Sequence, residues 1–325
     1  MSFLLAALMA TATATPATPV SRPVTAGAPV SRPVTAGPAG ALAGTLTMPV
    51  GRPRATLLII PGSGPTDRDG NNVLGVATAP YRMLASDLAA KRIATVRIDK
   101  RGMFASKTAG NPNAASIALY ARDTADWVAA TRRATGARCV WLAGHSEGGL
   151  IALASAHQPD ICGLILIAAP GRPLGQIIRA QLLANPANAP LLPPALAALD
   201  QLEAGKHADL SKMHPALAQG LFNPKVQDYL IEALRYDPAA LAKGTTVPIL
   251  IVQGDHDIQV PRADADRLAA AQPRAKLTVI AGMNHVLKIA PADRAANVAT
   301  YADPALPLAP GLVDTIVGFV TGAKK

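Results

Sequence analysis

Short apolar segments that alternate with helical patterns restrict the fold of this 325-residue chain more than any other feature. Their apolar runs are continuous, which is typical of strands covered on both faces of a sheet. The alternation predicts an α/β fold with a doubly wound, mostly parallel sheet. A strand at 42–48 opens the pattern, and the later predicted strands are 57–60, 94–98, 140–143, 164–168, 249–252 and 277–280. The predicted helices between them are 81–91, 116–135, 147–157 and 262–271.

One interval breaks this alternation. Residues 171–246 contain no strand pattern, only Ala- and Leu-rich amphipathic stretches such as 194–204 and 224–236. A loop of that length without secondary structure is uncommon in a compact domain. We therefore expect a helical cap or lid over the carboxyl-terminal edge of the sheet, inserted between two core segments at 41–170 and 247–325.

The segment before the core has a different character. Residues 1–15 hold a short apolar stretch followed by small residues, as in an export signal, although no Lys or Arg precedes it. This stretch is too short to span a bilayer, and a frayed apolar tail or a misplaced start codon is the alternative. Residues 16–40 contain Pro-Val-Ser-Arg-Pro-Val-Thr-Ala-Gly twice, at 19–27 and 29–37, which predicts a disordered linker. We expect an exported protein (periplasmic or secreted), or a cytoplasmic one if the segment is not a signal.

The composition limits the kind of partner. The formal net charge is +10, but only 3% of the residues are aromatic and the Lys and Arg residues are scattered. Nucleic-acid binding would call for a basic stripe interleaved with aromatic side chains, so we do not expect it. Half of the residues are hydrophobic, so a chain of this length can bury a sizeable aliphatic core. The composition does not indicate an oligomeric state.

The chain has two cysteines, Cys139 and Cys162. Two cysteines make neither a disulfide framework nor a metal site. Each stands at the start of an apolar predicted strand, so we expect buried free thiols. A bridge between them would require the two strands to be neighbours.

Residues 144–148 spell Gly-His-Ser-Glu-Gly between a predicted strand and a predicted helix. Strand, Gly-x-Ser-x-Gly and helix is the context of a nucleophile elbow, in which the turn lifts the serine above the sheet. The N-terminal N–H groups of the following helix favour negative charge at that point. Ser146 is therefore the expected nucleophile.

A serine hydroxyl is a poor nucleophile, so it needs a base and an acid that orients the base. His285 follows the last predicted strand, where a loop can bring its imidazole to Ser146. The loop after the preceding strand offers two carboxylates, Asp255 and Asp257. We favour Asp257 as the acid, because Gly254 and the next two residues turn the chain away from the strand. Asp255 is the alternative and would otherwise serve in a turn.

An oxyanion hole is expected from two backbone N–H groups. One belongs to Glu147, directly after the nucleophile, and the other to Ser63 in the glycine-rich loop 61–71. No Gly-Lys-Ser/Thr follows that loop, which excludes a phosphate loop. Residues 67–69 (Asp-Arg-Asp) are expected to hold the loop, and residues 99–102 (Asp-Lys-Arg-Gly) to form an ion-pair network beneath the site.

Taken together, these motifs from residue 42 onward resemble the α/β-hydrolase superfamily, in its serine esterase and serine aminopeptidase-like branch. The loop Pro-Gly-Ser-Gly-Pro-Thr-Asp-Arg-Asp-Gly is similar to that of bacterial short-chain carboxylesterases, with Pro61 where many lipases carry His. The resemblance implies hydrolysis of a small-molecule ester through an acyl-enzyme on Ser146, without metal or organic cofactor. A peptidase, amidase or thioesterase with the same triad is the alternative, and so is a catalytically silent binding protein with the hydrolase fold.

Overall fold

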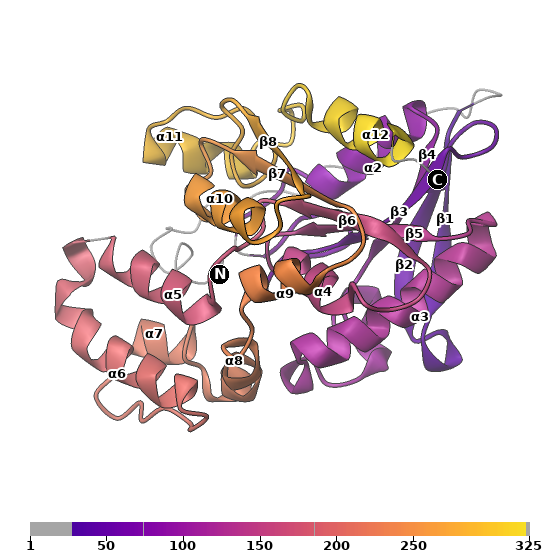
Figure 1. Cartoon of the computed structure of the whole chain (residues 1–325). Helices are drawn as coiled ribbons and strands as arrows, with labels where there is room; N and C mark the ends of the chain where they lie inside the picture. The colour runs from indigo at the N-terminus through magenta and orange to yellow at the C-terminus, as the bar shows by residue number, and fades with distance from the viewer. Residues whose placement is uncertain (1–27, 74, 185, 323–325) are drawn as a thin grey trace.

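The computed structural model describes residues 28–73, 75–184 and 186–322. Its strands are β1 (Val30–Ala36), β2 (Leu42–Met48), β3 (Ala55–Ile60), β4 (Ile93–Ile98), β5 (Val140–His145), β6 (Ile161–Ile167), β7 (Ile249–Gly254) and β8 (Lys276–Ile280). They form one sheet in the order β1-β2-β4-β3-β5-β6-β7-β8 (Figure 1). Neighbours from β4 to β8 are parallel, whereas β2 runs antiparallel to β1 and β4. The mostly parallel sheet expected from the sequence is confirmed.

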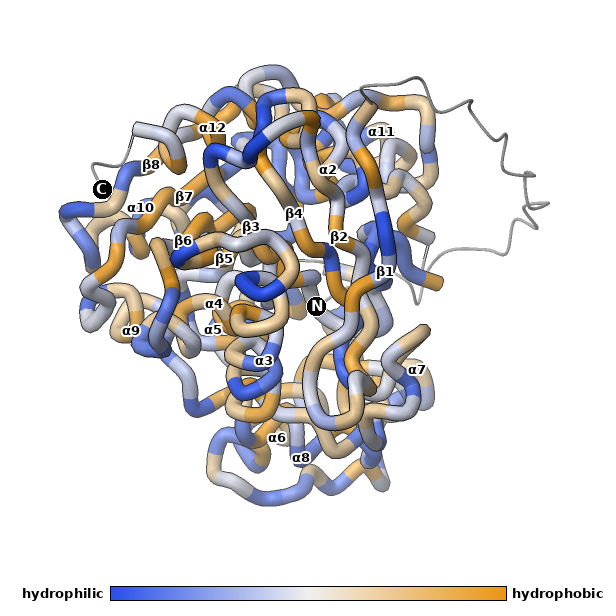
Figure 2. Tube along the Cα trace, turned by 90° about the vertical axis from the view of Figure 1, so that its right-hand side faces the viewer, coloured by the Kyte–Doolittle hydropathy of each residue, from blue (hydrophilic) through white to orange (hydrophobic). Residues whose placement is uncertain are grey.

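Helices cover both faces of the sheet. Apolar side chains of α2 (Pro80–Ala90) and α12 (Leu312–Gly322) pack on one face, and those of α3 (Ile117–Thr135), α4 (Glu147–Ser155) and α10 (Arg262–Ala271) pack on the other. The apolar residues concentrate along the central strands between these layers (Figure 2). Four of these helices, α2, α3, α4 and α10, begin within one residue of the predicted starts. Within the described residues, no helix is both long and apolar enough to cross a lipid bilayer.

The interval without strand patterns is helical, as expected. It contains α5 (Leu174–Leu183), α6 (Leu192–Glu203), α7 (Pro215–Gln219), α8 (Gln227–Ala233) and α9 (Pro238–Gly244). Helices α5 to α8 share a hydrophobic core of their own and lie to one side of the sheet (Figure 1). Helix α9 instead packs against α4 and α10. The remaining helices are α11 (Arg294–Ala299) and the 3-10 helices η1 (Pro38–Gly40), η2 (Phe104–Ala109), η3 (Pro112–Ala114), η4 (Pro186–Leu191), η5 (Pro224–Val226) and η6 (Thr300–Ala302).

The second copy of the repeat is part of the sheet, so the prediction of a disordered linker is wrong from residue 30 onward. Strand β1 pairs with β2 along its whole length, from Val30 opposite Met48 to Ala36 opposite Leu42. An edge strand needs few buried side chains, since backbone hydrogen bonds to one neighbour hold it, and it tolerates proline. The expected signal segment at 1–15 and the first repeat copy lie outside the described residues.

The two cysteines form a disulfide, so the prediction of free thiols is also wrong. Strands β5 and β6 are neighbours in the sheet, with Val140 opposite Ile161. This pairing brings the Cα atoms of Cys139 and Cys162 to 5.2 Å, within the range that a disulfide spans. The bond joins the amino-terminal ends of the two strands, at the opposite end of β5 from Ser146.

Candidate active site

Ser146 lies in a sharp turn between β5 and α4. Its backbone has φ 54° and ψ −125°, a conformation that costs a residue other than glycine roughly 1–3 kcal/mol. The flanking glycines are required by close approach of the backbone. A Cβ on Gly144 would lie 2.1 Å from the Gly148 oxygen, and one on Gly148 would lie 2.2 Å from the Ile60 oxygen. The residues expected to form an elbow therefore adopt that geometry.

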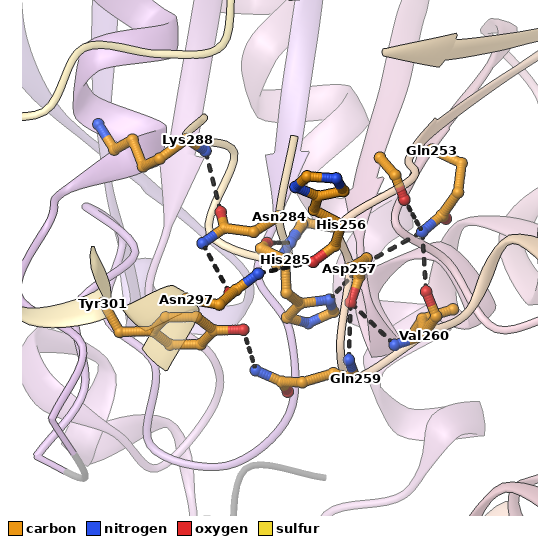
Figure 3. Close-up of polar contacts among 12 residues, drawn as sticks. Gln253, His256, Asp257, Gln259, Val260, Asn284, His285, Lys288, Asn297 and Tyr301 are labelled. Atoms are coloured by element: carbon orange, nitrogen blue, oxygen red, sulfur yellow. Dashed lines mark hydrogen bonds and ion pairs between the residues drawn. The ribbon is translucent and has the colours of Figure 1, made fainter. Parts of the chain in front are cut away.

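His285 and Asp257 are buried and in contact, although 28 residues separate them in the chain. The imidazole Nδ1 lies 2.8 Å from Asp257 Oδ2. The other carboxylate oxygen accepts hydrogen bonds from the N–H groups of Gln259 (2.8 Å) and Val260 (2.9 Å). Gln253 Nε2 also donates to Oδ2, at 3.2 Å. Figure 3 shows Asp257 between these donors and the imidazole, so the carboxylate is held in place from several sides.

The competing carboxylate has a different role. Asp255 is exposed, and its Oδ1 accepts the N–H of Gly282 at 2.6 Å, so it joins the turns after β7 and β8. The intervening His256 places its Nδ1 2.6 Å from the Ala290 carbonyl oxygen. Of the two carboxylates, the structure brings only Asp257 to His285.

A pocket brings the expected nucleophile and base together. Ser146, His285 and Ser63 all line one solvent-open hollow of about 420 Å³. The glycine-rich loop 61–71, the candidate oxyanion loop, comes close to Ser146, since a Cβ on Gly62 would lie 3.2 Å from the Ser146 Cβ. The walls come from the loops that follow β3, β5, β7 and β8, so the site is assembled at the carboxyl-terminal ends of parallel strands.

The helical insertion does not line this pocket within the part of the chain that the structure describes. Its residues instead border a second hollow of about 330 Å³, which Glu147 also lines together with Tyr229 of α8 and Ile177 of α5. One contact reaches the rim of the first pocket, where Gln181 Nε2 of α5 donates to the Gln259 carbonyl at 3.2 Å. A lid function for the insertion therefore stays a prediction.

The two N–H groups expected to form the oxyanion hole are free to receive an acceptor. Among the described residues, neither the Ser63 N–H nor the Glu147 N–H donates to another backbone or side-chain oxygen. Glu147 opens α4, and the first N–H groups of a helix have no partner within the helix. The Ser63 carbonyl accepts the Thr66 hydroxyl at 2.9 Å, which stabilises the loop.

Charged side chains hold the candidate oxyanion loop, as expected for residues 67–69. Arg68 forms an ion pair with Asp99, whose Oδ1 also accepts the Arg68 N–H at 2.9 Å. Asp69 pairs with Arg97, which extends from β4. Burial, together with the neighbouring Arg68, lowers the pKa of Arg97 to about 10. Asp67 closes the turn by accepting the Asp69 N–H at 2.8 Å.

A second network lies beneath the site, as expected for residues 99–102. Lys100 Nζ donates to the Gly62 carbonyl at 2.6 Å and lies 3.5 Å from Glu147 Oε1. Arg101 forms an ion pair with Asp123 of α3. The Lys100 contacts connect the end of β4 to the glycine-rich loop and to Glu147, whereas the Arg101 pair connects it to α3.

His145 joins the candidate oxyanion loop to the loop that carries His285, through contacts that the sequence did not reveal. Its Nε2 lies 2.8 Å from the His285 carbonyl oxygen, and its Nδ1 lies 2.7 Å from the Tyr81 hydroxyl. Burial, and then the nearby His285, lower the pKa of His145 to about 3, so the ring is neutral. A carbonyl only accepts, so Nε2 donates and Nδ1 accepts from Tyr81. The Tyr81 oxygen in turn accepts the Gly62 N–H at 3.3 Å.

Sequence reasoning missed several residues that support the site. Gln253 is one of them, and the signal for it is a polar side chain at the end of an otherwise apolar strand. Tyr81 gives no such signal, because an aromatic residue on a buried helix face is ordinary. Gln259 Nε2 donates to the Tyr301 hydroxyl at 3.1 Å, which fixes the turn that holds Asp257.

The sheet topology, the elbow and the pocket at the strand ends define an α/β-hydrolase. A family model described as serine aminopeptidase, S33 (Hydrolase_4) matches residues 75–289, which is more than half of the chain. The chain therefore belongs to this family of hydrolases.

A curated relative and several solved structures are similar to the chain. It is 26% identical over 256 residues to esterase EstD of Thermotoga maritima, in a match that covers 76% of this chain and 58% of EstD. It thus spans less than two thirds of the length of that relative. The esterase domain of a Rhodothermus marinus protein has a TM-score of 0.53 at 17% identity, over 90% of this chain and 98% of that one.

Two further structures have the same fold. Est1E of Butyrivibrio proteoclasticus, with ferulic acid bound, has a TM-score of 0.54 at 16% identity, over 86% of this chain and 94% of its own. Proline iminopeptidase of Mycobacterium smegmatis has a TM-score of 0.53 at 16% identity, over 90% and 98%. At these identities the structures support the α/β-hydrolase fold and leave the substrate open.

Proposed function

We propose that this protein is a serine hydrolase that cleaves carboxylic esters, preferentially with short acyl chains, through an acyl-enzyme on Ser146. One observation carries the proposal: Ser146 and His285 line the same pocket, while Asp257 contacts the far nitrogen of that imidazole at 2.8 Å. The hollow beside Ser146 is small and open to solvent, which favours a short acyl group.

The arrangement supports a two-step reaction. His285 Nε2 takes the Ser146 proton as the oxygen attacks the ester carbonyl, and Asp257 holds the imidazole and stabilises its cation. The N–H groups of Ser63 and Glu147 bind the tetrahedral oxyanion, each donor contributing about 3 kcal/mol to lowering the barrier. His285 then protonates the leaving alcohol, which breaks the ester bond. Water, activated by the same imidazole, releases the acid and restores Ser146.

The family's description favours amide hydrolysis as the second candidate. An aminopeptidase binds the free ammonium group of its substrate, for which a carboxylate facing the pocket is the natural partner. Among the described residues, no Asp or Glu lines the pocket that contains Ser146. Glu147, whose side chain lines the second hollow, is already paired with Lys100. This lining, together with the similarity to EstD, favours the ester.

Turnover of matched substrates tests this choice. Purified protein is assayed with p-nitrophenyl esters of increasing acyl length and with aminoacyl p-nitroanilides. We expect kcat/KM to be highest for the short esters and the anilides to be poor substrates. Better turnover of the anilides would refute the ester assignment. Folded protein that a fluorophosphonate does not label at Ser146 would instead indicate a silent binding protein.

A further inference from the structure

Lys100 occupies an unusual place for a lysine. It follows β4 and is 4% exposed, so its ammonium is buried behind the oxyanion loop. It does not line the pocket that contains Ser146, and no substrate in that pocket would touch it. Its described partners are the Gly62 carbonyl at 2.6 Å, the Glu147 carboxylate at 3.5 Å and the Tyr120 ring, whose centroid lies 5.5 Å away.

The contact with Gly62 fixes the direction of a peptide plane. In a trans peptide the C=O and the next N–H point in opposite directions, and the described residues contain no cis peptide bond. Because Lys100 holds the Gly62 carbonyl from behind the loop, the Ser63 N–H of that peptide points away from Lys100. Gly62 is also held at its own N–H, by the Tyr81 hydroxyl. The Gly62–Ser63 peptide therefore has little freedom to rotate.

The ion pair with Glu147 connects Lys100 to the residue whose backbone N–H is the second expected oxyanion donor. Burial, the largest single effect, raises the pKa of the Glu147 carboxyl, but Lys100 and smaller contributions from other neighbouring groups together lower it below its ordinary value, so the group is ionised. Glu147 follows Ser146 directly, and its backbone N–H is the other candidate donor. Lys100 thus joins the two segments that carry the candidate oxyanion donors, through its hydrogen bond to Gly62 and its ion pair with Glu147.

We propose that Lys100 is a positioning residue for the oxyanion hole, an inference that rests on the function proposed above. It orients the Ser63 N–H through the Gly62 carbonyl, and through Glu147 it sets the spacing between the two donors. Its charge at the carbonyl end of the peptide also polarises the amide, which strengthens the N–H as a donor. Stability alone gives little reason for the pair, because buried ion pairs are often replaced by apolar residues without loss.

The test removes both charges together with Lys100→Met/Glu147→Gln. A single substitution would leave one charge buried without its partner, which is strongly destabilising. We expect kcat for a p-nitrophenyl ester to fall about 10- to 100-fold while KM changes less than about two-fold, because the oxyanion forms only in the transition state. Affinity for a trifluoromethyl ketone, which forms a tetrahedral adduct with the nucleophile, should fall by the same factor.

A matched control removes the neighbouring ion pair with Arg101→Met/Asp123→Asn. That pair lies one residue further along the same turn and contacts neither Gly62 nor Glu147. Its loss should leave kcat and the affinity for the ketone unchanged. A purely structural role for Lys100 would predict that both double variants lose thermal stability without a selective loss of kcat and ketone affinity.

Folded Lys100→Met/Glu147→Gln protein with the kcat and ketone affinity of the wild type would overturn the inference. If that variant does not fold, Lys100→Gln/Glu147→Gln is tested by the same criterion, since the Gln amide ends short of the Gly62 carbonyl. The proposed function fails separately, when the wild-type protein neither hydrolyses esters nor reacts with a fluorophosphonate. If the wild type hydrolyses esters and the double variant has the same kcat, only the role of Lys100 is rejected.

Discussion

His145 should make the stability of this protein depend on pH between neutrality and moderate acid. The ring is buried between Tyr81 and the His285 carbonyl, and its pKa is lowered from 6.5 to about 3 by burial and then by His285. The unfolded chain therefore takes up a proton near pH 6.5, which the folded protein does not take up until about pH 3. The stabilisation is fully present above the unfolded pKa and is lost as the pH falls towards the folded pKa.

The size of the effect follows from this difference. Each pH unit between the two pKa values is equivalent to about 1.4 kcal/mol. At about pH 5 the pH has fallen roughly 1.5 units below the unfolded pKa, so folding should be weakened by about 2 kcal/mol relative to neutral pH. Asp257 and His285 also interact electrostatically with the His145 ring. Both remain in a variant that lacks only this imidazole, so their own contributions cancel when the variant is compared with the wild type.

Urea denaturation of the wild type and His145→Gln, at about pH 7.5 and about pH 5, measures this difference. The Gln amide can still donate towards the His285 carbonyl but does not titrate. We expect the wild type to lose about 2 kcal/mol more than the variant on acidification. An equal loss in both proteins would refute the argument. An imidazole proton signal of His145 that titrates near pH 6.5 in the folded protein would do the same, without any mutation.

Three further results are expected. Ser146→Ala should abolish ester hydrolysis with an unchanged circular dichroism spectrum, and retained turnover would exclude Ser146 as the nucleophile. Asp257→Asn should lower kcat about 10⁴-fold, whereas Asp255→Asn should change it far less; the reverse order in the same assay would make Asp255 the acid. Removal of residues 1–27 should leave activity and Tm near those of the full chain, whereas removal of 1–40 deletes β1 and should lower Tm. Equal Tm values for the two truncated proteins would show that β1 adds no stability.

The candidate triad could be predicted because its members follow strand ends. Apolar runs show where strands finish, and in a parallel sheet the carboxyl ends of strands lie along one edge. Ser146, Asp257 and His285 each lie in the loop or turn that follows such a run, so their order along the chain was informative. The choice between Asp257 and Asp255 depended on the direction of a single turn, and the structure brings Asp257 to His285.

The wrong predictions and the overlooked residues have a common physical cause. The disulfide between Cys139 and Cys162 depends on which strands are neighbours, and local patterns do not contain the strand order. Strand β1 buries few side chains. A pattern of apolar residues predicts a strand only where its side chains are buried, so it does not detect this one. Lys100 and Tyr81 act on the backbone of the loop after β3 from other elements. Such contacts become visible only when the elements are placed in space.

The geometry of the candidate site therefore depends on bonds between the loops as much as on the triad. The candidate oxyanion loop is fixed at Gly62, where Lys100 holds the carbonyl and Tyr81 the N–H. From Tyr81 the hydrogen bonds continue through His145 to the His285 carbonyl, so this loop and the candidate base are joined across the end of β5, next to Ser146. None of these bonds involves the helical insertion. Changes in the insertion should accordingly leave the spacing of Ser146, His285 and the two candidate oxyanion donors unchanged.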